Sequence, residues 1–222
     1  MRRVADRTLW ACLLLLSWAA SAHAEPEAKL AAAARASAAR VFTLSEREAL
    51  GAGNMVTRPL RFDDAGGHYV GGVSYQVVDA RPELVLAALA DVNNWPEALP
   101  RTKSARLVGT TNGLSRVELV QGSALVDARY TVVLERADGE TIRFWMDPSL
   151  SHDIRDVWGF FRVRALPGGR SLITVGAALD LGDGLTRMLF EDRIARMLLR
   201  APQQIRAFVE PRALALSSAP AP

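Results

Sequence analysis

The sequence predicts an α+β fold in which a meander of about seven antiparallel strands is followed by a long carboxy-terminal helix. Three observations lead to this prediction. Segments in which apolar and polar residues alternate are separated by strong turn signals. A short helix-like run lies between the first two strand-like segments. Near the carboxyl end, apolar residues recur at the spacing of a helix.

The first 24 residues have the pattern of a secretory signal peptide. Three arginines form a basic start, residues 9–20 are apolar, and an Ala-His-Ala sequence ending at Ala24 provides the small-x-small cleavage pattern. The apolar run is shorter than the roughly 20 residues that span a membrane, although an uncleaved anchor stays an alternative. We therefore expect a mature chain that begins at Glu25 and is exported, to the periplasm in a Gram-negative host.

Removal of this segment changes what the composition implies. It contains the only cysteine, Cys12, so the mature chain has no disulfide, thiol nucleophile or thiolate metal ligand. It also contains three of the 27 basic residues and one of the 24 acidic residues, which leaves 24 and 23, a formal net charge of +1. Nucleic-acid binding therefore loses its main compositional support.

Residues 25–66 are expected to form an amino-terminal helical extension. Residues 25–40 are rich in alanine and predict a helix or tether that is loosely docked, because alanine buries little area. Ser45 and Glu48 have the spacing of a capping box that starts one or two further helical turns. Three residues should then interrupt regular structure: Gly51, Gly53 and Pro59.

The domain itself is expected over residues 67–211, with a disordered tail at 212–222. Turn signals of the Asn-Gly, Asp-Gly and Gly-Gly type separate the strand-like segments, and residues 147–156 form the one long connection. The predicted strands cover residues 69–78, 103–109, 115–121, 128–136, 141–147, 157–166 and 171–181. The final helix should cover residues 184–210, and Pro202 should kink it or divide it in two.

Strand alternation assigns the apolar residues of the meander to one face, opposite the final helix. The opposite parity carries charged residues, as a solvated face does. Periodicity alone leaves open whether the apolar face is a filled core or lines a cavity. Trp145, Trp158 and Phe160 break the pattern because they share parity with the charged residues. These aromatics form an outer patch that the amino-terminal helix or a partner covers, or a bulge near Gly159 moves Trp158 and Phe160 inward. We favour the bulge.

Residues 91–100, with the sequence DVNNWPEALP, contain an aromatic-Pro-x-x-Leu-Pro turn from Trp95 to Pro100. With the order of strand, helix, turn and strand meander, this turn resembles the START-like (SRPBCC) superfamily, and within it the polyketide cyclase and coenzyme Q-binding proteins. The resemblance spans residues 67–211. It implies a helix-grip fold, in which a curved antiparallel sheet wraps a long carboxy-terminal helix around an apolar cavity.

The resemblance also implies a ligand and the residues that hold it. The ligand would be a hydrophobic small molecule, such as a lipid, quinone or polycycle, with possible transient membrane contact and no nucleic acid; the oligomeric state stays open. Trp95 and Leu99 would lie near the cavity mouth. The remaining ligand-binding residues are expected on the sheet and the final helix: Tyr130, Val132, Ile142, Phe144, Met146, Phe161, Val175, Met188, Ile194, Met197 and Leu198.

Chemistry-bearing motifs are scarce, and we expect neither a metal nor a cofactor. Two histidines remain after processing, His68 and His152, too few and too far apart for a zinc set. The cluster His152-Asp153-Ile154-Arg155-Asp156 could supply a general base, bind a ligand headgroup or form a solvated loop. The sequence thus favours an exported, non-catalytic binding protein. The alternatives are a cyclase or hydrolase acting on an apolar substrate through His152 or Tyr130, and a protein-interaction module with a filled core.

Overall fold

A computed structural model describes residues 42–64, 67–123, 126–182 and 185–218, with the side chains of residues 185–190 excepted. The predicted signal peptide, residues 25–41 and the side chain of Met188 lie outside this description. None of the described helices is both long enough and apolar enough to cross a membrane.

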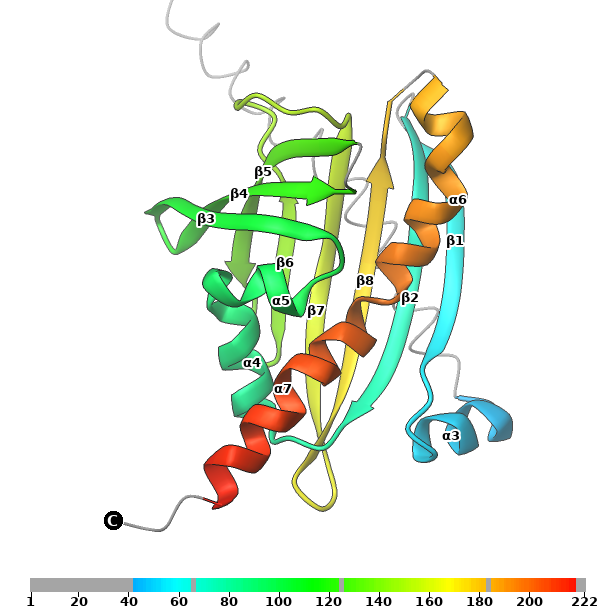
Figure 1. Cartoon of the computed structure of the whole chain (residues 1–222), viewed down its shortest axis with the longest axis vertical. Coiled ribbons are helices and arrows are strands. Elements are labelled where there is room, and N and C mark those ends of the chain that lie inside the picture. Colours follow the sequence, from blue (N-terminus) through cyan, green and yellow to red (C-terminus); the bar gives the residue numbers. More distant parts are fainter. Residues whose placement is uncertain (1–41, 65–66, 124–125, 183–184, 219–222) are drawn as a thin grey trace, which may run out of the picture.

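One curved antiparallel sheet organises the molecule (Figure 1). Its strand order is β1-β2-β8-β7-β6-β5-β4-β3. Between β2 and β3 the chain therefore crosses the width of the sheet, from near one edge to the opposite edge. The strands are β1 Val56–Asp64, β2 Gly67–Val78, β3 Thr102–Thr111, β4 Leu114–Gly122, β5 Asp127–Arg136, β6 Thr141–Met146, β7 Asp156–Leu166 and β8 Arg170–Asp180.

Helices fill the concave side of this sheet. The crossing from β2 to β3 is made by α4, a 3₁₀ turn and α5, and the chain ends in α6 and α7, which run across the same side (Figure 1). A further helix, α3, lies beside the end of β1 and β2. The helices are α3 Leu44–Gly51, α4 Pro82–Ala90, the 3₁₀ turn η1 Val92–Asn94, α5 Trp95–Ala98, α6 Leu185–Leu199 and α7 Ala201–Ser218. The predicted helix-grip arrangement is confirmed.

The sheet has one strand more than predicted. The prediction that Pro59 interrupts regular structure is wrong, because Pro59 lies inside β1 and pairs with Gly72 of β2. Strand β1 is at the edge of the sheet and bonds only to β2, so a missing N–H on its open side breaks no ladder. The sheet therefore begins at Val56, ahead of the expected domain start at residue 67.

The start of the first described helix and the end of the last one both differ from the prediction. Helix α3 is capped by Thr43, not Ser45: the Thr43 hydroxyl accepts from the Glu46 backbone N–H at 3.2 Å, and the Glu46 carboxylate accepts from the Thr43 N–H at 2.9 Å. The capping box thus lies two residues earlier than expected. At the other end, the expected tail at 212–222 is helical as far as Ser218. Alanine and leucine, both strong helix formers, follow Pro211 and continue α7.

The carboxy-terminal helix is divided, as Pro202 predicted. A turn at Arg200 separates α6 from α7, and Pro202 occupies the first turn of α7, where a backbone N–H has no partner within the helix. Helix α7 is anchored in the core by fully buried Ile205, and its Gln204 side chain donates to the carbonyls of Glu97 and Leu99 at 2.9 and 3.1 Å.

Helix α6 is attached differently. Of its described apolar side chains, Ala195 and Leu199 are buried, whereas Ile194 and Leu198 are only partly buried against the core. Charged contacts join it to the edge of the sheet: Glu191 lies 3.5 Å from Arg61 of β1 and 3.3 Å from the imidazole of His68 of β2. Asp192 pairs with Arg61 as well. The first half of the predicted helix is therefore held by ion pairs with the sheet edge in addition to its apolar contacts.

The concave face carries the main core, as the parity of the strands predicts, and the favoured bulge near Gly159 is wrong. Strands β6, β7 and β8 pair without a register shift, so Trp158 and Phe160 stay on the convex face. They form an outer cluster with Tyr69 and Ala178, against which Leu60, Phe62 and Trp145 pack.

Two glycines explain how large rings fit in this regular pairing. A Cβ at Gly159 would lie 2.5 Å from Cζ of Phe144, its partner on β6. A Cβ at Gly176 would lie 2.4 Å from Cε1 of Phe160, its partner on β7. Each glycine therefore leaves space for the aromatic ring of the neighbouring strand, so the rings need no irregular strand to be accommodated.

Candidate functional site

An apolar cavity of about 60 Å³ lies between the concave face of the sheet and the junction of α6 and α7. Its side chains come from the turn before β3, from the sheet and from both carboxy-terminal helices. The lining residues are Trp95, Leu99, Pro100, Leu119, Gln121, Tyr130, Val132, Phe144, Val157, Phe161, Val175, Ala177, Met197, Leu198 and Ala201. None of them is charged.

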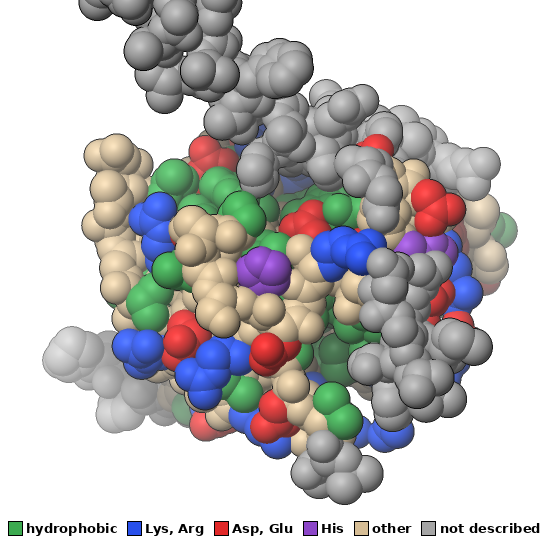
Figure 2. Space-filling model, turned by 90° about the horizontal axis from the view of Figure 1, so that it is seen from above, with side chains coloured by type: hydrophobic (Ala, Val, Ile, Leu, Met, Phe, Trp, Pro, Cys, Tyr) green, Lys and Arg blue, Asp and Glu red, His purple; other side chains and the backbone are tan. Residues whose placement is uncertain are grey.

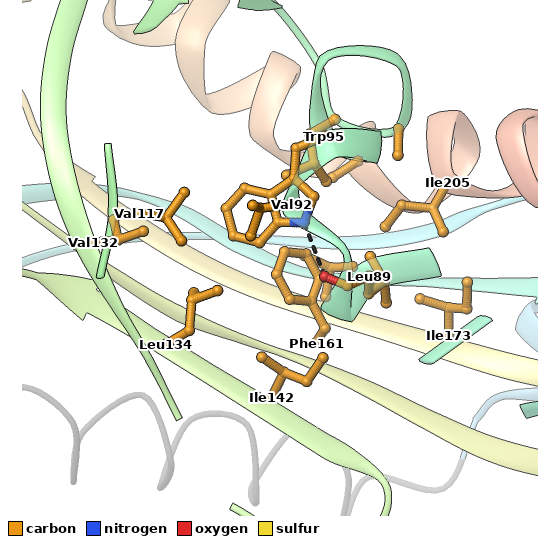
Figure 3. Packing of buried hydrophobic residues seen from close by; sticks show 14 of the residues in the cluster. Leu89, Val92, Trp95, Val117, Val132, Leu134, Ile142, Phe161, Ile173 and Ile205 are labelled. Atoms are coloured by element: carbon orange, nitrogen blue, oxygen red, sulfur yellow. Dashed lines mark hydrogen bonds between the residues drawn. The ribbon is translucent and has the colours of Figure 1, made fainter. Parts of the chain in front are cut away.

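Trp95 both packs the core and lines the cavity (Figure 3). Its side chain is 2% exposed, its ring meets the Phe161 ring edge-on at a centroid distance of 6.2 Å, and its indole N–H donates to the carbonyl of Leu89 at 2.9 Å. Local sequence explains this placement. Asp91 accepts from the Asn93 N–H and starts the 3₁₀ turn, and Pro96 then occupies the first turn of α5.

One polar pair faces the cavity. The Tyr130 hydroxyl donates to Oε1 of Gln121, and Nε2 of Gln121 donates to Thr102 Oγ1 at 2.8 Å. Pro100 also presents its carbonyl to Nε2 at 3.5 Å. Because a carbonyl can only accept, this contact fixes the orientation of the Gln121 amide. Burial raises the pKa of Tyr130 above its ordinary value, so its hydroxyl stays protonated and acts as a hydrogen-bonding group.

A larger space adjoins the cavity and opens to solvent. We call it the vestibule; its volume is about 410 Å³. It shares Gln121, Tyr130 and Met197 with the inner cavity, so these three side chains stand at the passage between them. Figure 2 looks down on this end of the molecule, where charged side chains of both signs surround hydrophobic surface. The other lining residues are Arg101, Gly122, Ser123, Val126, Asp127, Ala128, Asp153, Ile154, Leu179, Leu181, Arg193 and Ile194.

The structure brings most of the predicted ligand-binding residues together. Those that line the inner cavity are Trp95, Leu99, Tyr130, Val132, Phe144, Phe161, Val175, Met197 and Leu198. Ile194 lines the vestibule. Ile142 and Met146 are buried in the core but line neither space, because strand parity sets the face of a side chain and not its position along the strand.

Several lining residues were not predicted. Gln121 is the most informative, since it shares strand parity with fully buried Val117 and with Leu119, and a polar residue at such a position is a signal in the sequence. Ala177 and Val157 were assigned to the concave face but not to the site. Pro100 and Ala201 follow from no pattern in the sequence, because they reach the cavity only through the docking of α5 against α7.

The side chains of the His152 cluster do not converge on one site, although Asp153 and Ile154 line the vestibule. His152 is exposed, and its Nδ1 lies 2.7 Å from the carbonyl of Ile154. Asp153 accepts from the backbone N–H of Arg129 at 2.8 Å, whereas Asp156 accepts from the Tyr69 hydroxyl at 2.8 Å on the convex face. Within the described part of the chain, no three His, Cys, Asp or Glu side chains are grouped so as to hold a metal ion.

Comparison with known proteins gives matches at the level of family and fold. The sequence profile of the family described as polyketide cyclase / dehydrase and lipid transport matches residues 72–208. No curated protein sequence matches this chain. Among solved structures, a protein from Thermus thermophilus superposes with a TM-score of 0.55 at 18% identity, covering 66% of this chain and 98% of that one.

Two further structures are similar. A STAR-related lipid transfer protein from Xanthomonas axonopodis has a TM-score of 0.54 at 13% identity, covering 68% of this chain and 98% of that one. The Zhui aromatase/cyclase from a Streptomyces species has a TM-score of 0.52 at 16% identity, covering 74% and 98%. At these identities the likeness establishes the START-like, helix-grip fold.

Proposed function

This chain belongs to the polyketide cyclase/dehydrase and lipid-transport family, and on that basis we propose that it is a non-catalytic binding protein for one hydrophobic small molecule. The ligand, a lipid, quinone or polycycle, occupies the space between the concave face of the sheet and α6. The observation that carries the proposal is the uncharged inner cavity with its single polar pair, Gln121 and Tyr130, opening into the vestibule.

The volumes constrain how such a ligand binds. The inner cavity, at about 60 Å³, is smaller than the roughly 150 Å³ cavity that admits a benzene molecule. The vestibule, at about 410 Å³, falls within the roughly 300–1,000 Å³ of ordinary ligand pockets. A ligand would therefore place most of its body in the vestibule and insert one apolar end past Tyr130 and Met197.

The lining of the inner cavity favours binding over catalysis. General acid–base catalysis needs a group that exchanges a proton near neutral pH, and there is no histidine, carboxylate or amine among the described residues that line the inner cavity. Tyr130 is the one titratable group among these described residues, and burial moves its pKa further from neutrality. The existence of a cavity also disfavours the alternative of an interaction module with a filled core.

Native mass spectrometry of the mature protein from its own host, followed by organic extraction, tests the proposal. A stoichiometric adduct that extracts as a lipid, quinone or polycycle is the expected result. A bare polypeptide mass that stays unchanged after incubation with a lipid extract would contradict the proposal.

Filling the inner cavity should weaken this binding. Ala177 lines the cavity and is buried, so Ala177→Leu places three more carbon atoms in the space. If two methylene groups of the ligand are excluded, the loss is about 1.6 kcal/mol, or roughly tenfold in affinity. Titration of the extracted ligand measures the change. Ala165→Leu, at an exposed position of β7, is the matched control and should bind as the wild type does.

The proposal includes export, which the signal-peptide pattern supports. Amino-terminal sequencing of the protein isolated from its host should give Glu-Pro-Glu, starting at Glu25. A chain that keeps its first 24 residues in the isolated protein would contradict cleavage, and recovery from the cytoplasmic fraction would contradict export.

A further inference from the structure

Two arginines from separate parts of the chain line the vestibule. Arg101 lies in the turn between α5 and β3, and Arg193 lies on α6, so one comes from each side of the space. Both side chains are exposed. Within the ranges that the structure describes, neither guanidinium makes an ion pair or a side-chain hydrogen bond.

The carboxylates of the vestibule are engaged elsewhere. Asp127 pairs with the ammonium group of Lys103 at 2.6 Å. Asp153 accepts a hydrogen bond from the backbone N–H of Arg129 at 2.8 Å. Lys103 therefore offsets one of the two negative charges, and the guanidinium groups are left as the available hydrogen-bond donors with positive charge at the vestibule.

The backbone of Arg101 is in the left-handed region, with φ of 56°. A residue with a Cβ adopts this conformation at a cost of roughly 1 kcal/mol, whereas glycine adopts it freely and asparagine at reduced cost. Strained backbone of this kind occurs at functional sites. An arginine at this position therefore indicates that its side chain, which lines the vestibule, has a functional role.

We infer that the vestibule binds the anionic group of an amphipathic ligand, and that Arg101 and Arg193 are the residues that recognise it. This inference rests on the proposed binding function and specifies the ligand class: an elongated apolar molecule that ends in a carboxylate or a phosphate. The planar guanidinium forms paired hydrogen bonds with either anion. The anion stays in the solvated vestibule, and the apolar end enters the inner cavity past Gln121, Tyr130 and Met197.

Three probes with the same chain test this inference: dodecanoate, dodecyl phosphate and dodecanol, each below its micelle or solubility limit. Affinities are measured with the mature chain by titration calorimetry. At least one anionic probe should bind roughly tenfold or more tightly than dodecanol, because each arginine supplies a charge-assisted hydrogen bond. The difference should shrink as salt is added, since the arginines are exposed.

Variants assign the preference to its residues. Arg101→Asn removes the charge with a residue that tolerates the left-handed backbone, and Arg193→Gln keeps much of the helical side chain. The double variant should bind the anionic probes about as weakly as dodecanol, with the dodecanol affinity unchanged. Arg164→Gln, at an exposed arginine of β7 outside the vestibule, is the matched control and should keep the preference.

The outcomes separate this inference from the proposed function. Equal affinity of the wild type for all three probes, unaffected by the double variant, would overturn the role of the arginines while the binding function stands. An anionic preference that survives in the double variant would overturn it as well. If no probe binds and no ligand is extracted from the host protein, the proposed function fails and the inference fails with it.

Discussion

Gly71→Ala should destabilise the protein by more than about 4 kcal/mol or prevent folding altogether. Gly71 has φ of 152°, and a Cβ there would lie 2.0 Å from the carbonyl oxygen and 2.9 Å from the carbonyl carbon of Ala177. Both atoms belong to the backbone of β8, which is held by β2 on one side and β7 on the other, so neither can move aside cheaply. Urea unfolding, or soluble yield if the variant does not fold, measures the effect.

Gly109→Ala provides the matched control. Gly109 is also a strand glycine, in β3, but a Cβ there would meet nothing within 4 Å. Its substitution should change the free energy of unfolding by no more than about 0.5 kcal/mol. If Gly71→Ala proved as mild as Gly109→Ala, the backbone of β8 would not limit the space for a side chain at position 71.

Trp95→Ala should cost roughly 3–5 kcal/mol of stability, the usual range for removing a buried aromatic side chain. The substitution empties a site that is 2% exposed, removes the edge contact with Phe161, and leaves the Leu89 carbonyl without the indole donor. It also joins new space to the inner cavity, which Trp95 lines. Chemical denaturation of the ligand-free protein measures the loss.

Trp95→Phe separates the two contributions. The phenyl ring keeps most of the apolar contact but cannot donate, so this variant should lose roughly 1–3 kcal/mol for the unpaired carbonyl of Leu89. The two variants should therefore rank in the order Phe, then Ala, of increasing loss. A loss below about 1 kcal/mol in Trp95→Ala would mean that the turn is not part of the cooperative core.

Much of the fold could be predicted because local rules decide it. Turn chemistry is one such rule: Asn112 and Gly113, with φ of 52° and 78°, adopt the left-handed backbone that a tight hairpin needs. Strand parity is another, and it separated the concave from the convex face correctly. The rules failed where the effect of a residue depends on its position in the sheet. A proline would interrupt a central strand, but Pro59 lies in an edge strand, where it is tolerated.

The site was predicted less completely for the same reason. Parity and the family resemblance predicted most of the apolar lining, because an inward-facing residue of the sheet lies opposite the final helix and faces the space between them. They could not predict where along a strand the cavity lies. Its position depends on how side chains of different sizes pack together, as the Phe144 ring does over Gly159. That Arg101 and Arg193 of α6 line the same space follows only from the docking of distant elements.

The division of the carboxy-terminal helix has a consequence for exchange between bound and free states. Detaching α7 would expose side chains such as Ile205 and break the bonds of Gln204, so it amounts to global unfolding. Detaching α6 would break the contacts of Glu191 and Asp192 with the sheet edge and would expose Ala195 and Leu199. Because the turn at Arg200 separates the two helices, α6 can be displaced while α7 stays in the core, so we expect that ligand release does not require the domain to unfold.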